Sequence, residues 1–262
     1  MYQALYEPLP DLDLYLKRIN VEKSDNCTVE YLDELLLAHQ YAVPFENLDI
    51  FESHLDIDIS GQGLFDKIVN RRRGGYCFEL NSMFYRLVTA LGYDAYPCLA
   101  RVLLGREGAA PSLHRLTMVR IDGDVYVCDV GFGGPQPSFA LKVEDKFVKT
   151  SLGGIHQKFK IEKTGDWWTI YFLAHDGWMR TIQFMNIEID EVEFIAPNFY
   201  CSKCNDSMFV KERIVNLKTE TGNKSILKDE FVEIINHNRT ATPIENPEKM
   251  KELLDIHFGI KI

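Results

Sequence analysis

The 262-residue sequence predicts an α+β fold in which helices come first, antiparallel strands follow and both types mix near the end. Apolar residues recur at three- and four-residue steps through residues 1–92, which is the spacing of amphipathic helices. After Gly92 the chain turns to runs of β-branched and aromatic residues, broken by turn signals such as Asp122-Gly123. An Asn-Pro pair near the C-terminus is typical of the start of a closing helix.

The N-terminal part predicts several short helices. Residues 11–19 carry their apolar side chains on one helical face, and Asn20 can adopt the left-handed conformation that ends a helix. Thr28 is the expected N-cap of a second helix, which a proline stops ahead of a loop at 45–47. A further short helical piece is expected over 63–70.

The most informative stretch is residues 71–93, where Cys77 follows two glycines and begins a predicted helix. The buried stripe of this helix comprises Leu80, Phe84, Leu87 and Leu91, and Gly92 suits its end. Unpaired first-turn N–H groups and the helix dipole favour a thiolate and can stabilise an oxyanion. The alternative is that Cys77 is a small buried apolar side chain, which is the commonest state of a free cysteine.

The middle of the chain predicts an antiparallel sheet or a small barrel. Strands are expected over 95–104, 116–121 and 125–130, and Asp122-Gly123 is a strong hairpin signal between the last two. A second hairpin is expected over 159–173, and this region extends to about residue 184.

The final third mixes element types. A short helix is expected over 192–198, and residues 208–217 and 225–235 predict two strands or a strand and a helix. Asn246 and Pro247 are an N-cap and a first-turn proline, so they predict a helix over 248–257 that Gly259 ends.

Composition excludes several classes of function. The net charge of −10 and pI near 5.2 argue against a nucleic-acid partner or an anionic membrane surface. No apolar run approaches the roughly 20 residues of a membrane span, and the N-terminus lacks the pattern of a signal peptide. Six scattered cysteines do not form the frame of a disulfide-rich fold, so a reducing, cytoplasmic location is expected.

The predicted hairpin brings a histidine and a carboxylate together. If Asp122-Gly123 is a two-residue turn, Ile121 faces Asp124, and the same register continued places His114 opposite residue 131. Asp129 then lies two residues away on the face of His114, within reach of a hydrogen bond. A three-residue turn would put these two side chains on opposite faces.

These residues complete a nucleophilic constellation. A cysteine nucleophile needs a base, and an imidazole needs a carboxylate to orient it and to stabilise its charged form. Cys77, His114 and Asp129 supply these groups, and a Cys77–His114 ion pair is expected before substrate arrives. Each residue alone has an ordinary structural explanation, but the combination favours catalysis.

Three other motifs carry weaker signals. The glycine-rich segment 131–135 exposes backbone N–H groups that can face phosphates or a thioester, although such glycines usually only make turns. Cys201 and Cys204 lack two further ligands at zinc spacing, so we expect two ordinary thiols and no metal. The arginines at 71–73 suit either phosphate binding or structural ion pairs.

The sequence resembles the arylamine N-acetyltransferases over essentially its whole length. The matching segments are YLKRI at 15–19, LLLAHQYAVPFENLDI at 35–50, RRGGYCFELN at 72–81, LHRLTMV at 113–119, DVGFGGP at 129–135 and HFGI at 257–260. The set formed by RGGxCxExN, the later histidine and DVGFG is highly specific.

The resemblance implies both a fold and a chemistry. The expected parts are a helical bundle over 1–92, a β-barrel over 93–188, and an interdomain helix with an α/β lid over 189–262, built around a papain-like Cys-His-Asp core. Acetyl-coenzyme A would acetylate Cys77, with His114 as base and Asp129 as its orienting group. The acetyl group would then pass to an arylamine, an arylhydrazine or an arylhydroxylamine.

The resemblance also implies supporting residues. Glu46 and Arg73 match positions of a buried ion pair. Gly133, Gly134, Tyr200 and Ser207 are the expected coenzyme A contacts, although the segment NFYCSKCNDSMF at 198–209 lacks the proline common in the family.

Two competing interpretations remain open from the residues alone. A cysteine peptidase or a transglutaminase-like enzyme would use the same three groups without coenzyme A. A binding protein that keeps the fold without turnover is the other alternative, and the intact triad argues against it.

Overall fold

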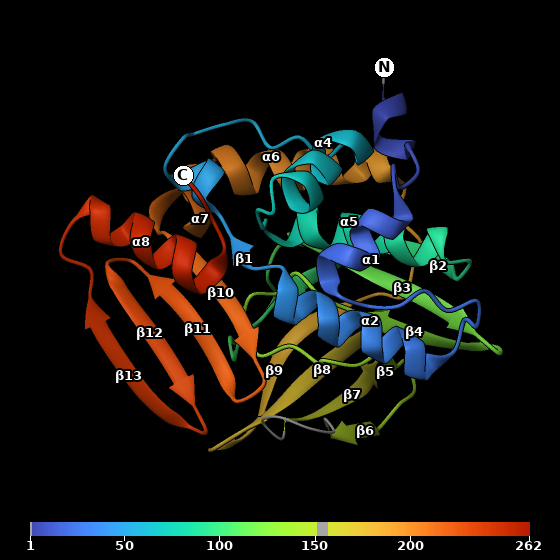
Figure 1. Ribbon diagram of the computed structural model, residues 1–262. Coiled ribbons are helices and arrows are strands. Elements are labelled where there is room, and N and C mark those ends of the chain that lie inside the picture. The colour runs from blue at the N-terminus through green and yellow to red at the C-terminus, as the bar shows by residue number, and fades with distance from the viewer. Residues whose placement is uncertain (1, 151–156) are drawn as a thin grey trace.

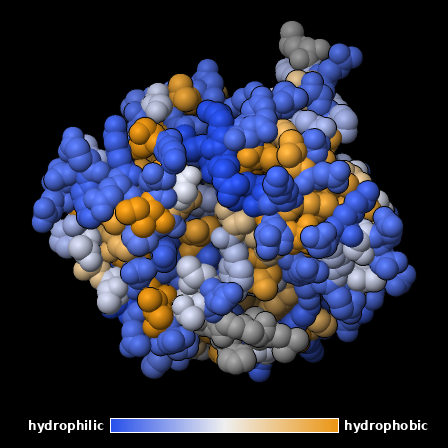
Figure 2. All heavy atoms as spheres, in the orientation of Figure 1, coloured by the Kyte–Doolittle hydropathy of each residue, from blue (hydrophilic) through white to orange (hydrophobic). Residues whose placement is uncertain are grey.

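The computed structural model describes residues 2–150 and 157–262 and has the expected α+β architecture (Figure 1). N-terminal helices lie on one side of an eight-stranded antiparallel sheet, and a five-stranded sheet covered by one helix lies beside both. Hydrophilic residues cover most of the face in Figure 2, where apolar residues form separate patches. Within the described residues, no helix is long and apolar enough to cross a membrane.

The N-terminal helices begin and end largely where the sequence predicts. They are η1 (Gln3–Tyr6), α1 (Leu12–Ile19), α2 (Val29–Ala42), α3 (Leu48–Phe51), α4 (Gly61–Phe65), the π-helical η2 (Asp66–Asn70) and α5 (Cys77–Ala90). Asn20 ends α1 with φ 58°, and the Thr28 side chain accepts a hydrogen bond from Tyr31 N at 3.2 Å. The piece expected at 63–70 comprises α4 and η2 and begins at Gly61.

Helix α5 is the central helix of the N-terminal part. Its predicted stripe is buried, and Gly92 follows the helix with φ +98°. The helix packs against β2 and β3, so its first residue lies against the edge of the barrel.

The eight-stranded sheet forms a nearly closed barrel with the order β5-β4-β3-β2-β9-β8-β7-β6. Its strands are β2 (Asp94–Val102), β3 (His114–Ile121), β4 (Asp124–Cys128), β5 (Leu141–Lys142), β6 (Phe147–Thr150), β7 (Lys158–Thr164), β8 (Trp167–Ala174) and β9 (Gly177–Phe184). Apolar side chains from these strands form one buried cluster.

The β3–β4 hairpin has the predicted register. Asp122 and Gly123 both have positive φ, at 52° and 85°, as a two-residue type I′ turn requires. Ile121 therefore faces Asp124, and the pairing continues to Thr117 opposite Cys128. The ladder stops there, so the chain after Cys128 leaves the sheet before it reaches the position opposite His114.

The C-terminal part contains η3 (Glu191–Phe194), α6 (Ile195–Lys203), α7 (Met208–Lys211) and a sheet of β1 (Phe45–Glu46), β10 (Ile214–Thr219), β11 (Gly222–Leu227), β12 (Glu230–Ile235) and β13 (Asn238–Pro243). Helix α8 (Pro247–Phe258) closes the chain, with Asn246 as N-cap and Gly259 at φ 67°.

Three expectations for this sheet are wrong. The segment expected as one strand or helix at 225–235 contains the end of β11 and all of β12, with a turn at 228–229 between them. The segment expected as a loop at 45–47 contains β1, because Phe45 pairs with Asn216 of a strand far away in sequence. The segment expected as one strand at 208–217 starts as α7, because Ser207 caps that helix by accepting from Phe209 N at 3.2 Å.

Candidate active site

Cys77 is the first residue of α5 and its side chain is buried. The helix start is held by a capping box in which Glu79 Oε2 accepts a hydrogen bond from Tyr76 N at 3.0 Å. Cys77 Sγ lies 3.9 Å from the carbonyl oxygen of Leu113, the residue that precedes β3. The thiol is therefore positioned between the first turn of α5 and the start of a barrel strand.

Burial sets the electrostatics of this thiol. It raises the pKa of Cys77 well above the ordinary value, and the nearby Cys201 and Asp129 add to the rise, whereas the backbone N–H groups of Arg115 and Phe78 lower the pKa. The effect expected from the helix start is present but is outweighed, so burial opposes a thiolate formed without proton transfer to a partner.

His114 is the first residue of β3 and is also buried. Its Nε2 lies 2.8 Å from Asp129 Oδ2, which is the pair that the hairpin register predicts. The ring of Phe132 packs edge-on against the imidazole, with centroids 5.8 Å apart. Because Asp129 occupies Nε2, Nδ1 is the ring nitrogen that is left for Cys77.

Asp129 is oriented by a second set of bonds. Its Oδ1 accepts from Asn81 Nδ2 and from Gly131 N, both at 2.9 Å, while Oδ2 faces His114. Asn81 Oδ1 in turn accepts from Val130 N at 2.9 Å. Asn81 is the last residue of the motif RGGxCxExN, but the motif alone assigns it no role. Its place one turn after Cys77 puts both residues on the same face of α5.

Gly131 lets the loop after Asp129 contact this helix. A Cβ at position 131 would lie 2.9 Å from Cys77 Cα and 3.0 Å from Asn81 Nδ2. The absence of a side chain therefore allows Asp129 to approach α5 closely.

Buried ion pairs support the start of α5. Arg73 contacts Glu46 at 2.8 Å and Asp49 at 2.9 Å, which includes the expected Glu46–Arg73 pair. Lys67 contacts Asp49 at 2.8 Å and Glu79 at 2.7 Å, and Glu79 belongs to the capping box. The sequence gives no local signal for Asp49 or Lys67, because their partners are far away in sequence.

The four expected coenzyme contacts lie in two places. Gly133 and Gly134 line a cavity of about 670 Å³ between α2, the loop after β4 and strands β10 and β11. Tyr200 is exposed on α6, and Ser207 Oγ donates to Cys201 O at 2.6 Å. Cys77 and His114 are not among the residues that line this cavity.

The two thiols near the C-terminal part are unpaired. Cys201 Sγ lies 3.9 Å from the same Leu113 carbonyl oxygen as Cys77 Sγ, whereas Cys204 ends α6. Among residues 2–150 and 157–262, no group of three or more potential metal ligands comes together.

A buried thiol at a helix start contacts the carbonyl of the residue before a histidine whose imidazole is held by a carboxylate. This set of groups is typical of enzymes that react through a cysteine thioester. Comparison with known proteins narrows that class. A family model described as N-acetyltransferase matches residues 28–262. An arylamine N-acetyltransferase of Escherichia coli is 32% identical over 201 residues, which cover 76% of this chain and 70% of that protein.

Two further relatives match nearly the whole chain. A Salmonella typhimurium protein named arylamine N-acetyltransferase / N-hydroxyarylamine O-acetyltransferase is 27% identical over 96% of this chain and 89% of its own. The structure of the Mycobacterium marinum arylamine N-acetyltransferase in complex with CoA has a TM-score of 0.87 and 27% identity, covering 95% of this chain and 93% of that one. The chain belongs to the arylamine N-acetyltransferase family and is an enzyme of that family.

Proposed function

We propose that this enzyme moves an acetyl group from acetyl-coenzyme A, through a thioester on Cys77, to the nitrogen of an arylamine or arylhydrazine. The oxygen of an arylhydroxylamine is a further acceptor. The observation that carries the proposal is the 2.8 Å bond between His114 Nε2 and Asp129 Oδ2, because it leaves Nδ1 for the thiol at the start of α5.

The first half-reaction acetylates the cysteine. His114 Nδ1 takes the thiol proton while Cys77 Sγ attacks the thioester carbonyl carbon. This transfer leaves the net charge of the pair unchanged, so no uncompensated thiolate is buried. Asp129 stabilises the imidazolium that forms. First-turn N–H groups of α5 are the donors available to the oxyanion. The C–S bond to coenzyme A then breaks, and its sulfur takes the proton from His114.

The second half-reaction reverses these roles. The amine nitrogen attacks the acetyl carbon of the Cys77 thioester, and His114 takes one amine proton. The bond from carbon to Cys77 Sγ breaks, and the sulfur regains a proton from the imidazolium. The product is an amide, and the free enzyme returns to its starting state.

Two features of the site bear on how the donor binds. Cys77 is only 3% exposed, so the side chains around it have to move when the thioester enters. Gly133 and Gly134 are proposed donor contacts because they belong to the loop that follows Asp129. Tyr200 and Ser207 are further proposed contacts, and Ser207 would have to share a hydroxyl now bonded to Cys201 O.

Intact-mass measurement after incubation with acetyl-coenzyme A tests the proposal. We expect one acetyl adduct on the wild type and on Cys98→Ala, a control that removes a buried barrel thiol, and none on Cys77→Ala. Addition of an arylamine should remove the adduct and release the acetylated amine. Peptide cleavage without an adduct would favour a peptidase, and binding of acetyl-coenzyme A without an adduct would favour a protein without turnover.

We also propose a cytoplasmic location. All six cysteines are free thiols, which is the state expected in a reducing compartment.

A further inference from the structure

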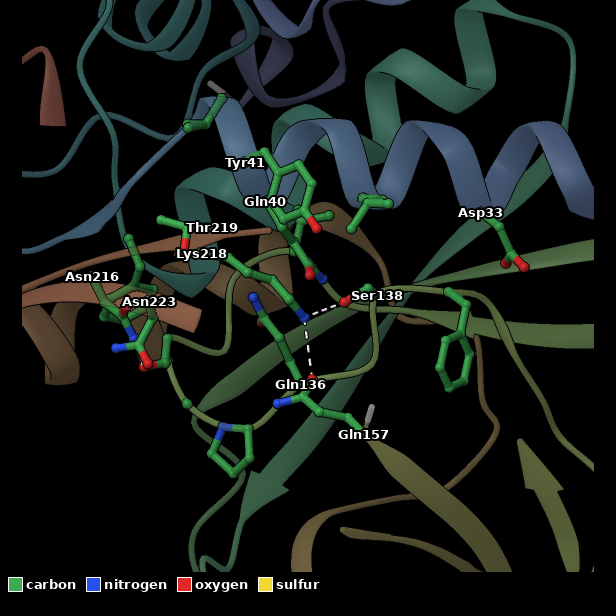
Figure 3. A pocket seen from close by; sticks show the side chains of 18 of the residues that line it. Asp33, Gln40, Tyr41, Gln136, Ser138, Gln157, Asn216, Lys218, Thr219 and Asn223 are labelled. Atoms are coloured by element: carbon green, nitrogen blue, oxygen red, sulfur yellow. Dashed lines mark hydrogen bonds between the residues drawn. The ribbon is translucent and has the colours of Figure 1, made fainter. Parts of the chain in front are cut away.

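The cavity of about 670 Å³ between α2, the loop after β4 and strands β10 and β11 has a size suited to a small organic molecule. Its walls combine apolar side chains such as Leu37 and Phe139 with a group of polar ones (Figure 3). None of these polar side chains has a part in the proposed acetyl transfer. We therefore ask which ligand their charges and hydrogen-bonding groups would fit.

Lys218 of β10 extends its ammonium group into the middle of this cavity (Figure 3). Its Nζ donates to Ser138 Oγ and, at 3.2 Å, to Gln157 Oε1. Within the described parts of the chain no carboxylate forms an ion pair with Lys218, and residues 151–156 contain no Asp or Glu. Burial lowers the pKa of Lys218 to about 8, so the group is mostly charged at neutral pH without an acidic partner.

Two side-chain oxygens that belong to cavity-lining residues also lack a partner. Gln40 Oε1 and Asn216 Oδ1 are buried and, in the described structure, accept no hydrogen bond. Their amide nitrogens are engaged, since Gln40 Nε2 donates to Asp129 O at 3.0 Å and Asn216 Nδ2 donates to Gly133 O at 2.9 Å. Both oxygens are therefore fixed as acceptors that need a donor.

The charge at the rim limits how negative a ligand can be. Glu30 and Glu34 of α2 line the same cavity, and Asp33 is already neutralised by Lys149 at 2.6 Å. These carboxylates would repel a polyanion, whereas a single negative charge can be matched by Lys218 alone.

We propose that this cavity binds a small monocarboxylate that also carries N–H or O–H donors. The carboxylate lies against Lys218 Nζ, and the donors face Gln40 Oε1 and Asn216 Oδ1. The site adjoins the catalytic groups through Gln40 and shares Gly133 and Gly134 with the proposed donor contacts. Cys77 is outside it, so binding of the carboxylate does not require Cys77.

Calorimetric titration with hippurate, which carries one carboxylate and one amide N–H, tests the proposal. Its uncharged counterpart hippuramide is the matched ligand, and inorganic pyrophosphate is the polyanion. Wild type and Cys77→Ala should bind hippurate at least about tenfold more tightly than hippuramide, since a hydrogen bond to a charged group is the stronger kind. Pyrophosphate should bind more weakly than hippurate.

Variants of Lys218 show whether the preference comes from this residue. Lys218→Met should bind hippurate and hippuramide equally weakly, whereas Lys218→Arg and the surface control Lys142→Met should keep the preference. The melting temperature of Lys218→Met should not fall, because the variant removes a buried charge that has no acidic partner. Cys77 acetylation, measured separately by mass, reports on the proposed function and not on this site.

Three results would overturn the proposal. The first is equal affinity of the wild type for hippurate and hippuramide, including no binding of either. The second is a preference that survives in Lys218→Met. The third is Lys218-dependent binding of pyrophosphate in place of hippurate, which would assign the cavity to phosphates.

Discussion

At the scale of single residues, the Asp129 carboxylate is the most constrained group of the site. Its two oxygens receive Asn81 Nδ2, Gly131 N and His114 Nε2 at 2.8–2.9 Å. The bonds to Oδ1 fix the plane of the carboxylate, so Oδ2 can hold only one orientation of the imidazole. This geometry makes the acid a positioning residue whose charge also stabilises the imidazolium.

Asp129→Asn should lower the rate of Cys77 acetylation by about 10²–10⁴-fold, because the neutral amide no longer supports the charged imidazole. Stopped-flow measurement of coenzyme A release would show this. Asp176→Asn, at a fully exposed carboxylate, is the control and should react like the wild type. A rate for Asp129→Asn near that of the control would contradict the proposed role.

The three central residues were accessible from sequence because each depends on a local pattern. A glycine pair and a helical stripe locate Cys77, and a two-residue turn relates His114 to Asp129. Asn81 was not accessible in this way, because an asparagine inside a helix has no pattern that reveals its partner. The rise in the pKa of Cys77 does not follow from the sequence, because a sequence indicates the helix start but not the depth of burial.

At the scale of elements, the contact between α5 and the loop after β4 joins the thiol to the acid. Gly131→Ala would put a Cβ 2.9 Å from Cys77 Cα. The backbone of a helix cannot easily move to relieve this contact. We expect a loss of stability of about 1–3 kcal/mol and a slower acetylation of Cys77, because the loop has to move away from α5. Urea unfolding and the acetylation rate measure the two effects.

Gly134→Ala is the comparison for this prediction. Its added Cβ would meet Phe132 Cε1 at 3.2 Å, which is the side chain of a neighbouring residue and not helix backbone. The loss of stability should therefore be smaller. An equal loss in the two variants would mean that close contact with α5 is not the cause.

Helices α1, α2 and α5 meet around His39, which makes stability depend on pH. The ring lies between Tyr15 and Phe84, and neither ring nitrogen has a hydrogen-bond partner among the described residues. Burial lowers the pKa of His39 to about 3, so below about pH 6.5 the unfolded chain binds a proton that the folded protein does not. The stability that is present above pH 6.5 is therefore lost as the pH falls toward 3.

His39→Leu should remove this contribution. Between pH 7.5 and 5.5 the free energy of unfolding of the variant should fall by about 1.4 kcal/mol less than that of the wild type. Urea unfolding at both pH values measures this difference. His175→Leu, at a fully exposed histidine, is the control, and its free energy of unfolding should fall by the same amount as that of the wild type. A variant at position 39 with the wild-type dependence would show that another group is responsible.

Elements with a strong local signal agree with the sequence, whereas those made by distant partners do not. Helix α5 and the β3–β4 hairpin carry their own stripe and turn, so their bounds follow from the chain itself. Strand β1 has only two residues, Phe45 and Glu46, and exists because β10 lies beside it. A segment of that length cannot show the alternation by which a strand is recognised.

At the scale of the whole molecule, we propose that residues 1–92 carry the nucleophile, 93–188 its base and acid, and 189–262 the lid. These three parts share structure across their boundaries. Strand β1 from the first part is an edge strand of the C-terminal sheet, and one apolar cluster extends from Leu5 to Ile214. We therefore expect a single cooperative unfolding transition in place of three.

Asn47 is the side chain that joins the first part to the third. Its Nδ2 donates to Phe209 O at 2.7 Å and to Glu212 O at 2.8 Å, and its Oδ1 accepts from Ile214 N at 2.8 Å. Asn47→Ala would leave these three backbone groups without their partner. We expect a loss of about 2–4 kcal/mol, since the site is buried and the groups cannot all reach water.

The way in which Asn47→Ala unfolds tests whether the parts are independent. If they form one cooperative unit, tryptophan fluorescence, which reports on the barrel, and far-ultraviolet circular dichroism should give the same lowered midpoint. Asn238→Ala, in the exposed outer strand β13, should change stability by less than about 0.5 kcal/mol. Separate midpoints for the two signals would show that the lid unfolds alone. The hydrogen bonds of Asn47 would then stabilise only the lid and would not couple it to the other parts.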